Sequence, residues 1–148
     1  MQPNTPIQRN CYILLVEDNP VDADLAKRAF SKGSNAISFA LARDGEEALK
    51  FIPQWDAGAH LPTFILLDLK LPKVDGLQVL RELKTHPKYR VIPIIVLTSS
   101  SEERDLQMAY ELGANSYIVK EIDYDKFSKT AAEIKSYWCY LNVIPQKN

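Results

Sequence analysis

Phe64-Ile65-Leu66-Leu67-Asp68 is a short apolar run that ends in a carboxylate. A second run, Tyr12–Val16, ends in the same way, with Glu17 and Asp18. Short continuous runs rich in Ile, Leu and Val are typical of strands that are buried on both faces of a parallel sheet. Because the carboxyl ends of parallel strands lie along one edge of the sheet, the two runs predict three acidic side chains at that edge.

Two further apolar runs end in polar residues of complementary chemistry. Ile94–Leu97 is followed by Thr98, and Ser116–Val119 is followed by Lys120. If both runs are strands of the same sheet, a hydroxyl and an ammonium group lie beside the three acids. This grouping of side chains predicts a site rather than a set of unrelated surface residues.

Helix signals alternate with the strand signals, which include a fifth strand at Ile37–Leu41. The first predicted helix is Val21–Ser31, and the second runs from Asp44 to about Ile52, where Pro53 ends it. The third begins at Asp75-Gly76, and the fourth ends at Gly113. The fifth runs from Asp123 to about Leu141. Such alternation indicates an α/β fold, here a flavodoxin-like, doubly wound, five-stranded parallel sheet of order 2-1-3-4-5 with five helices. In that order the ligand-binding switch point lies between the first and third strands, where the acids are.

Composition limits the class of protein. The 148 residues suffice for one domain, and the net charge of −1 argues against a nucleic-acid partner. No apolar run approaches the ~20 residues that span a membrane, and the polar N-terminus lacks a signal core, so a cytoplasmic protein is expected. Cys11 and Cys139 are expected to be reduced thiols. The predicted organisation is a flexible segment 1–10, a domain 11–141 and a tail 142–148.

Three carboxylates in one cleft repel one another and need a cation. Mg²⁺ is a hard ion that takes oxygen ligands, and it commonly uses one or two carboxylates together with water. With Mg²⁺ and Lys120, the formal charges of Glu17, Asp18 and Asp68 are neutralised, so the site can accept an anion. A phosphoryl group fits, because a carboxylate can attack phosphorus to form an acyl phosphate.

These residues resemble a two-component response-regulator receiver domain. The resemblance covers roughly residues 12–136 and depends on motifs in a fixed order at strand ends: Glu17-Asp18, Asp68 with Leu69-Lys70-Leu71-Pro72 and Asp75-Gly76, Thr98-Ser99, Gly113-Ala114, Tyr117 and Lys120. Among receivers, the chain looks like the phytochrome-associated regulators of cyanobacteria, which stand alone without an output domain.

The resemblance implies a role for each matching residue. Asp68 would be the phosphoacceptor, with Thr98 and Lys120 contacting the phosphoryl group. Thr98 and Tyr117 would be the switch residues, although Tyr117 could also be core packing. Mg²⁺ would be held by Glu17, Asp18, Asp68 and the backbone carbonyl of Lys70. The donor would be a histidine kinase, possibly a phytochrome, and the protein would be a signalling phosphoacceptor rather than an enzyme.

One position departs from the family. Receivers usually have a proline after the lysine, often with a cis bond, but Glu121 follows Lys120 here. A cis bond before a residue other than proline costs about 2.5–4 kcal/mol, so the reach of Lys120 is open. The carboxylate of Glu121 is expected to point to solvent.

Other functions remain as alternatives. An aspartyl-nucleophile phosphatase would need an acid two residues after Asp68, where Lys70 stands, and a flavodoxin would need a phosphate-binding loop where Glu17-Asp18-Asn19 stands. A receiver-shaped scaffold that is never phosphorylated is a further alternative.

The last helix carries aromatic residues on more than one face, Tyr137, Trp138 and Tyr140, which predicts a homodimer through this end of the chain.

Overall fold

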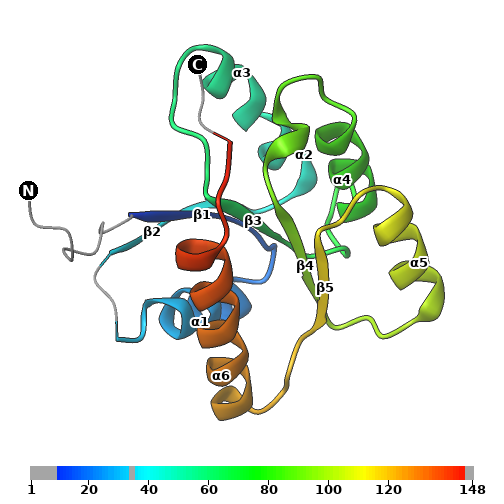
Figure 1. The fold of residues 1–148 in the computed structure, drawn as a ribbon. Coiled ribbons are helices and arrows are strands. Elements are labelled where there is room, and N and C mark those ends of the chain that lie inside the picture. Colours follow the sequence, from blue (N-terminus) through cyan, green and yellow to red (C-terminus); the bar gives the residue numbers. More distant parts are fainter. Residues whose placement is uncertain (1–9, 34–35, 146–148) are drawn as a thin grey trace, which may run out of the picture.

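The computed structural model describes residues 10–33 and 36–145, and its strands form one parallel sheet (Figure 1). The strand order is β2-β1-β3-β4-β5, which confirms the predicted order 2-1-3-4-5. The strands are β1 (Cys11–Val16), β2 (Ile37–Ala42), β3 (Phe64–Leu67), β4 (Ile94–Thr98) and β5 (Ser116–Val119). Each strand after β1 is reached by a crossover connection, as parallel pairing requires.

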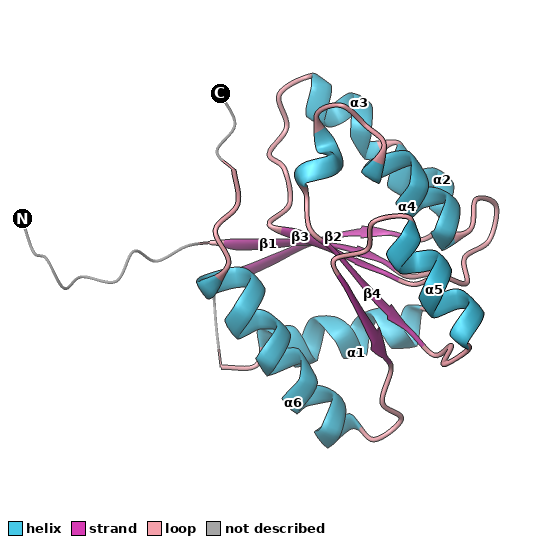
Figure 2. Ribbon diagram, turned by 45° about the vertical axis from the view of Figure 1, so that its right-hand side comes forward, coloured by secondary structure: helices cyan, strands magenta, loops and turns pink. Residues whose placement is uncertain are grey.

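Helices cover both faces of the sheet (Figures 1 and 2). One face is covered by α1 (Pro20–Ser31) and α6 (Tyr124–Lys135), which pack against each other. The other is covered by α2 (Gly45–Leu49), α3 (Phe51–Asp56), α4 (Gly76–Lys84) and α5 (Glu103–Glu111). A short 3₁₀ turn, η1 (Tyr89–Val91), precedes β4, and a π-helical turn, η2 (Ser136–Leu141), follows α6. All five predicted helical regions are therefore helical, the second as two short helices.

The strand pairing sets the positions of the acids. Leu15 pairs with Leu66 and Val16 with Leu67, so β1 and β3 end at the same level. The ladder continues one step further, where the amide of Asp68 donates to the carbonyl of Val16 at 3.1 Å. The residues that follow the two strands are thus adjacent, as the doubly wound topology predicts for a ligand-binding edge.

The second helical region differs from the prediction at its end. Asp44 caps α2 as predicted, because its Oδ1 accepts from the amide of Glu47 at 2.8 Å. The chain then breaks at Lys50 and resumes as α3, in which Pro53 lies in the first turn. A proline there lacks only an amide that has no partner inside the helix, so Pro53 does not end the region at Ile52.

The last helical region also differs from the prediction. The spacing of apolar residues predicts that Leu141 faces the sheet, but its side chain is 69% exposed. The reason is η2, whose wider π-helical turn changes the register beyond Lys135, so that Cys139 is buried instead.

The expectation of free thiols is wrong, because Cys11 and Cys139 form a disulfide. Cys11 begins β1 and Cys139 lies in η2, with their Cα atoms 5.4 Å apart. The pairing depends on the register of η2, which the helical periodicity of the sequence does not reveal.

The predicted termini are only partly covered. Residues 1–9 of the predicted flexible segment lie outside the described residues, as do residues 146–148 of the predicted tail. Residues 142–145 have no regular secondary structure. Within the described part of the chain, no helix has the length and apolar character needed to cross a bilayer.

Candidate functional site

The three predicted acids converge at the carboxyl edge of the sheet. Glu17 and Asp18 follow β1, Asp68 follows β3, and one carboxylate oxygen from each lies within 4.8 Å of the others. Glu17 is buried, Asp18 is exposed, and Asp68 is only slightly exposed. Such a set of hard oxygen ligands fits a divalent cation, with Asp18 on the solvent side where an ion could enter.

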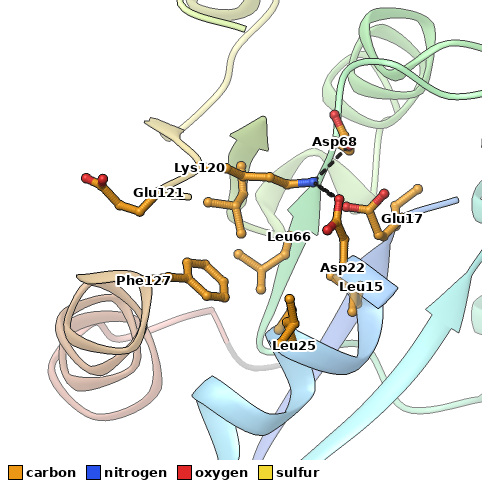
Figure 3. A pocket seen from close by; sticks show the side chains of 12 residues that line it. Leu15, Glu17, Asp22, Leu25, Leu66, Asp68, Lys120, Glu121 and Phe127 are labelled. Atoms are coloured by element: carbon orange, nitrogen blue, oxygen red, sulfur yellow. Dashed lines mark hydrogen bonds and ion pairs between the residues drawn. The ribbon is translucent and has the colours of Figure 1, made fainter. Parts of the chain in front are cut away.

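Lys120 reaches this cluster from the end of β5 (Figure 3). Its backbone amide donates to the carbonyl of Thr98 at 2.8 Å, which extends the β4–β5 ladder. The ammonium group donates to Glu17 through a short hydrogen bond and to Oδ2 of Asp68 at 3.1 Å. The lysine therefore bridges the acids of two different strands.

The environment of Lys120 keeps it charged. Burial alone would lower the pKa of its ammonium group, but the hydrogen bonds to Glu17 and Asp68 and the charges of both acids together outweigh burial and raise that pKa. For Glu17 the balance is different, because burial raises the pKa of its carboxyl group even though Lys120 opposes the shift. The cluster therefore contains a firmly protonated cation and a carboxylate whose ionised form is disfavoured by burial.

A chain of hydrogen bonds leads from Asp68 to Tyr117. The hydroxyl of Thr98, which is fully buried, donates to Oδ1 of Asp68 at 3.0 Å. The amide of Ser100 lies 3.4 Å from the same Thr98 oxygen, and the carbonyl of Ser100 accepts from the Tyr117 hydroxyl at 2.9 Å. Burial raises the pKa of the Tyr117 phenol. The β4–α5 loop thus connects the two predicted switch residues.

The loop after β3 packs tightly around Asp68. The amide of Lys70 donates to Oδ1 of Asp68 at 3.2 Å, while the Lys70 side chain is exposed. A Cβ atom on Gly76 would lie 2.3 Å from the carbonyl oxygen of Asp68, so only glycine fits at the start of α4. The loop can therefore hold the backbone of residues 68–70 close to the acidic cluster.

Comparison with known proteins identifies the family of the chain. Residues 13–132 match the response regulator receiver domain family. The chain belongs to this family.

Similar proteins include two regulatory proteins from different organisms. The chain is 42% identical over 134 residues to a probable methanogenesis regulatory protein, FilR2, of Methanothrix harundinacea, covering 90% of this chain and 86% of that protein. It is 36% identical over 135 residues to the response regulator Rcp1 of Synechocystis, covering 90% and 92%. The family's role is to accept a phosphoryl group in two-component signalling, and its members interact with histidine kinases.

Solved structures support the same relationship. The phosphorylated cyanobacterial phytochrome response regulator RcpA has a TM-score of 0.86 and 35% identity, covering 93% of this chain and 99% of that one. The Mn²⁺-bound form of Rcp1 has a TM-score of 0.83 and 36% identity, covering 92% and 99%. Receiver domains bind a divalent metal in an acidic pocket, and the cluster of Glu17, Asp18 and Asp68 has this character.

The structure answers the question of Lys120 and Glu121 and adds one residue to the site. No cis peptide occurs among the described residues, so Lys120 reaches Asp68 with a trans bond to Glu121. Glu121 is exposed, as predicted, and its carboxylate points away from Asp68 (Figure 3). Asp22, which the sequence analysis missed, lies with its carboxylate 3.6 Å from the Lys120 ammonium. Its only signal in the sequence is its position in the first turn of α1, four residues after Asp18.

Proposed function

We propose that this receiver accepts a phosphoryl group on Asp68 from a histidine kinase and signals through protein contacts. The observation that supports this proposal is the environment of the Asp68 carboxylate. One of its oxygens accepts from the Thr98 hydroxyl and the other from the Lys120 ammonium. Both donors are placed to hold phosphoryl oxygens once the group is attached.

The proposed reaction transfers the group from nitrogen to oxygen. An oxygen of Asp68 attacks phosphorus, the bond from phosphorus to the kinase histidine breaks, and an acyl phosphate forms. Lys120 remains protonated throughout, because its pKa is raised, and its charge offsets that of the incoming oxygens. Thr98 donates its hydroxyl proton in a hydrogen bond and undergoes no covalent change.

The proposed cation is Mg²⁺, held by Glu17, Asp18, Asp68 and the backbone carbonyl of Lys70. When bound, the ion supplies positive charge that balances the carboxylates and the phosphoryl oxygens. The donor set supports this assignment, since carboxylate and carbonyl oxygens suit a small hard ion better than a thiophilic one.

We expect Mg²⁺ to stabilise the protein, and Asp18→Asn to remove most of this effect. At a Mg²⁺ concentration 100 times Kd, a ligand that binds only the folded state adds about 2.7 kcal/mol to the free energy of unfolding. Without Mg²⁺, Asp18→Asn should be at least as stable as the wild type, because it removes one of several repelling charges. Urea unfolding with and without Mg²⁺ measures both effects.

Asp24→Asn is the matched control, since Asp24 is exposed on α1 and has no part in the cluster. It should respond to Mg²⁺ as the wild type does. An equal Mg²⁺ response of Asp18→Asn and Asp24→Asn would contradict the role of Asp18.

Thr98 and Tyr117 form the proposed switch. A phosphoryl oxygen that accepts from Thr98 replaces its hydrogen bond to Asp68, and the β4–α5 loop then follows Thr98. The bond from Tyr117 to the carbonyl of Ser100 supports this coupling, because it ties the tyrosine to the same loop. The switch is thus a loop with two arrangements, of the kind that phosphorylation biases.

Transfer from a kinase tests the proposed function. A purified phytochrome-type histidine kinase, first labelled on its own histidine, should lose its label to this chain within minutes in Mg²⁺. Repeated turnover of phosphate esters without a stable phosphoprotein would instead support the phosphatase alternative. Absence of transfer from any donor, including small acyl phosphates, would support the scaffold alternative.

A phytochrome partner and a cytoplasmic location are part of the proposal, supported by the similarity to Rcp1 and RcpA.

The proposed output includes a homodimer through the end of the chain. Tyr137, Tyr140, Leu141 and Val143 are 49%, 44%, 69% and 74% exposed. Aromatic residues are enriched in interfaces, and an exposed apolar group of this kind favours association. We place the receiver domain at residues 11–141, with residues 143–145 extending this surface and residues 142–148 as a C-terminal tail.

We expect the protein to sediment as a dimer at high micromolar concentration. Leu141→Ser should weaken dimerisation at least about tenfold, because burying one aliphatic side chain adds about 1.5–3 kcal/mol to the free energy of association. Ile122→Ser is the matched control, because Ile122 is fully exposed in the loop before α6, at the far end of that helix. A monomer under these conditions, both with and without a phosphoryl mimic, would disprove the dimer.

A further inference from the structure

The disulfide between Cys11 and Cys139 joins residues near the two ends of the described chain, 128 positions apart. Both side chains are buried, in the apolar layer between the sheet and helices α1 and α6. Cys11 lies at the start of β1, whereas Glu17 follows the end of that strand. The pair is therefore at the opposite edge of the sheet from the phosphoacceptor and has no part in the chemistry proposed above.

The disulfide contributes more to holding η2 against the domain than to holding α6 there. Phe127, Ala131 and Ile134 bury α6 against the sheet, and the ammonium of Lys135 donates to the carbonyl of Lys32 at 2.9 Å. Beyond Lys135, Cys139 is the buried residue of η2, and Trp138 is half-buried. Without the disulfide, one small side chain and part of one indole ring would hold this turn to the domain.

The disulfide is buried, so a reagent reaches it only when the structure around it opens. Thiol–disulfide exchange needs a thiolate to approach a sulfur atom, which a rigid core prevents. A helical turn with a single buried residue, such as η2, opens locally more often than a central strand that is buried on both faces. Opening of η2 therefore exposes the sulfur of Cys139 while β1, which carries Cys11, stays folded.

We propose that Cys11 and Cys139 form a reversible thiol–disulfide site that reacts with dithiols, and that reduction releases η2 from the sheet. A thiolate of the dithiol attacks Sγ of Cys139, the disulfide breaks, and Cys11 leaves as a thiolate that takes up a proton. The second thiol of the reagent then attacks the mixed disulfide, frees Cys139, and closes a cyclic disulfide. Two electrons and two protons pass from the dithiol to the protein, and a disulfide oxidant reverses the step.

Release of η2 changes the positions of Tyr137, Tyr140 and Leu141 relative to the sheet, and these residues belong to the proposed dimer surface. This consequence alone rests on the proposed function. A protein that is monomeric in both redox states would contradict the dimer, while the exchange reaction and the release of η2 would still stand.

The test uses the whole chain in buffers of reduced and oxidised dithiothreitol. Thiols are alkylated and counted by intact mass, and hydrogen–deuterium exchange is followed in peptides covering residues 124–135 and 136–142. Both thiols are expected to become reactive together as the buffer becomes more reducing. Exchange in 136–142 should accelerate at least about tenfold on reduction, while exchange in 124–135 stays unchanged.

Cys11→Ala provides the matched variant. Without reductant it should show the fast exchange of the reduced wild type in 136–142, and dithiothreitol should not change it. If its fold is impaired, the reduced wild type alone decides the question. Failure of the two thiols to pair in oxidised dithiothreitol would overturn the proposal. Equal hydrogen–deuterium exchange of residues 136–142 in both redox states would also overturn it.

Discussion

Asp68→Asn is expected to abolish phosphorylation of the protein. The amide nitrogen and neutral oxygen of asparagine are poor nucleophiles, so no acyl phosphate forms at this position. Asparagine retains the shape of aspartate, and Lys120 keeps its contacts with Glu17 and Asp22, so the fold should persist. Intact-mass spectrometry after incubation with acetyl phosphate and Mg²⁺ should show one added phosphoryl group on the wild type and none on the variant.

Asp24→Asn serves as the control for this measurement. It makes the same chemical change on an exposed position of α1 and should be phosphorylated like the wild type. Equal phosphorylation of Asp68→Asn and Asp24→Asn would show that another group is the acceptor.

Lys120→Met is expected to slow phosphorylation by about 10²–10³-fold, the range found when one donor to a developing charge is removed. Methionine preserves the apolar stem of the lysine but leaves Glu17 and Asp68 without their shared cation. The rate of mass gain with acetyl phosphate at saturating Mg²⁺ measures the effect. Lys126→Met, at an exposed position of α6, should react at the wild-type rate.

The pH dependence of stability distinguishes a lost charge from a general disturbance of the fold. The pKa of Lys120 is raised in the folded protein, so its contribution to stability is fully present below pH 10.5 and is lost as pH rises through the folded pKa. The difference in unfolding free energy between the wild type and Lys120→Met should therefore shrink above pH 10.5. A difference that stays constant there, together with a wild-type phosphorylation rate, would contradict the role assigned to Lys120.

The sheet and the cluster at its edge could be predicted from the sequence because two independent signals coincide. Continuous apolar runs mark the strands, and the residue after each of these runs is polar, so parallel topology alone brings Glu17, Asp68 and Lys120 together. The connecting helices matter little for this conclusion. The wrong end assigned to the second helical region therefore left the predicted site unchanged.

The features that could not be predicted depend on local register. Leu141 is exposed and Cys139 is buried, the reverse of what α-helical spacing predicts, because η2 has a wider turn than an α-helix. No residue in Ser136–Leu141 signals this wider turn. The disulfide follows from that register and was missed for the same reason. Asp22 was missed because an acid in the first turn of a helix is common, and only its distance to Lys120 sets it apart.

Chemical mapping of the phosphorylated residue tests the central claim most directly. Borohydride reduces an aspartyl phosphate to homoserine, which changes the mass of the peptide that carries it. After phosphorylation by acetyl phosphate in Mg²⁺ and reduction, homoserine is expected at position 68. Homoserine at Asp18 or Asp75 instead, or at no position in a protein that has gained a phosphoryl group, would contradict the assignment of Asp68 as the phosphoacceptor.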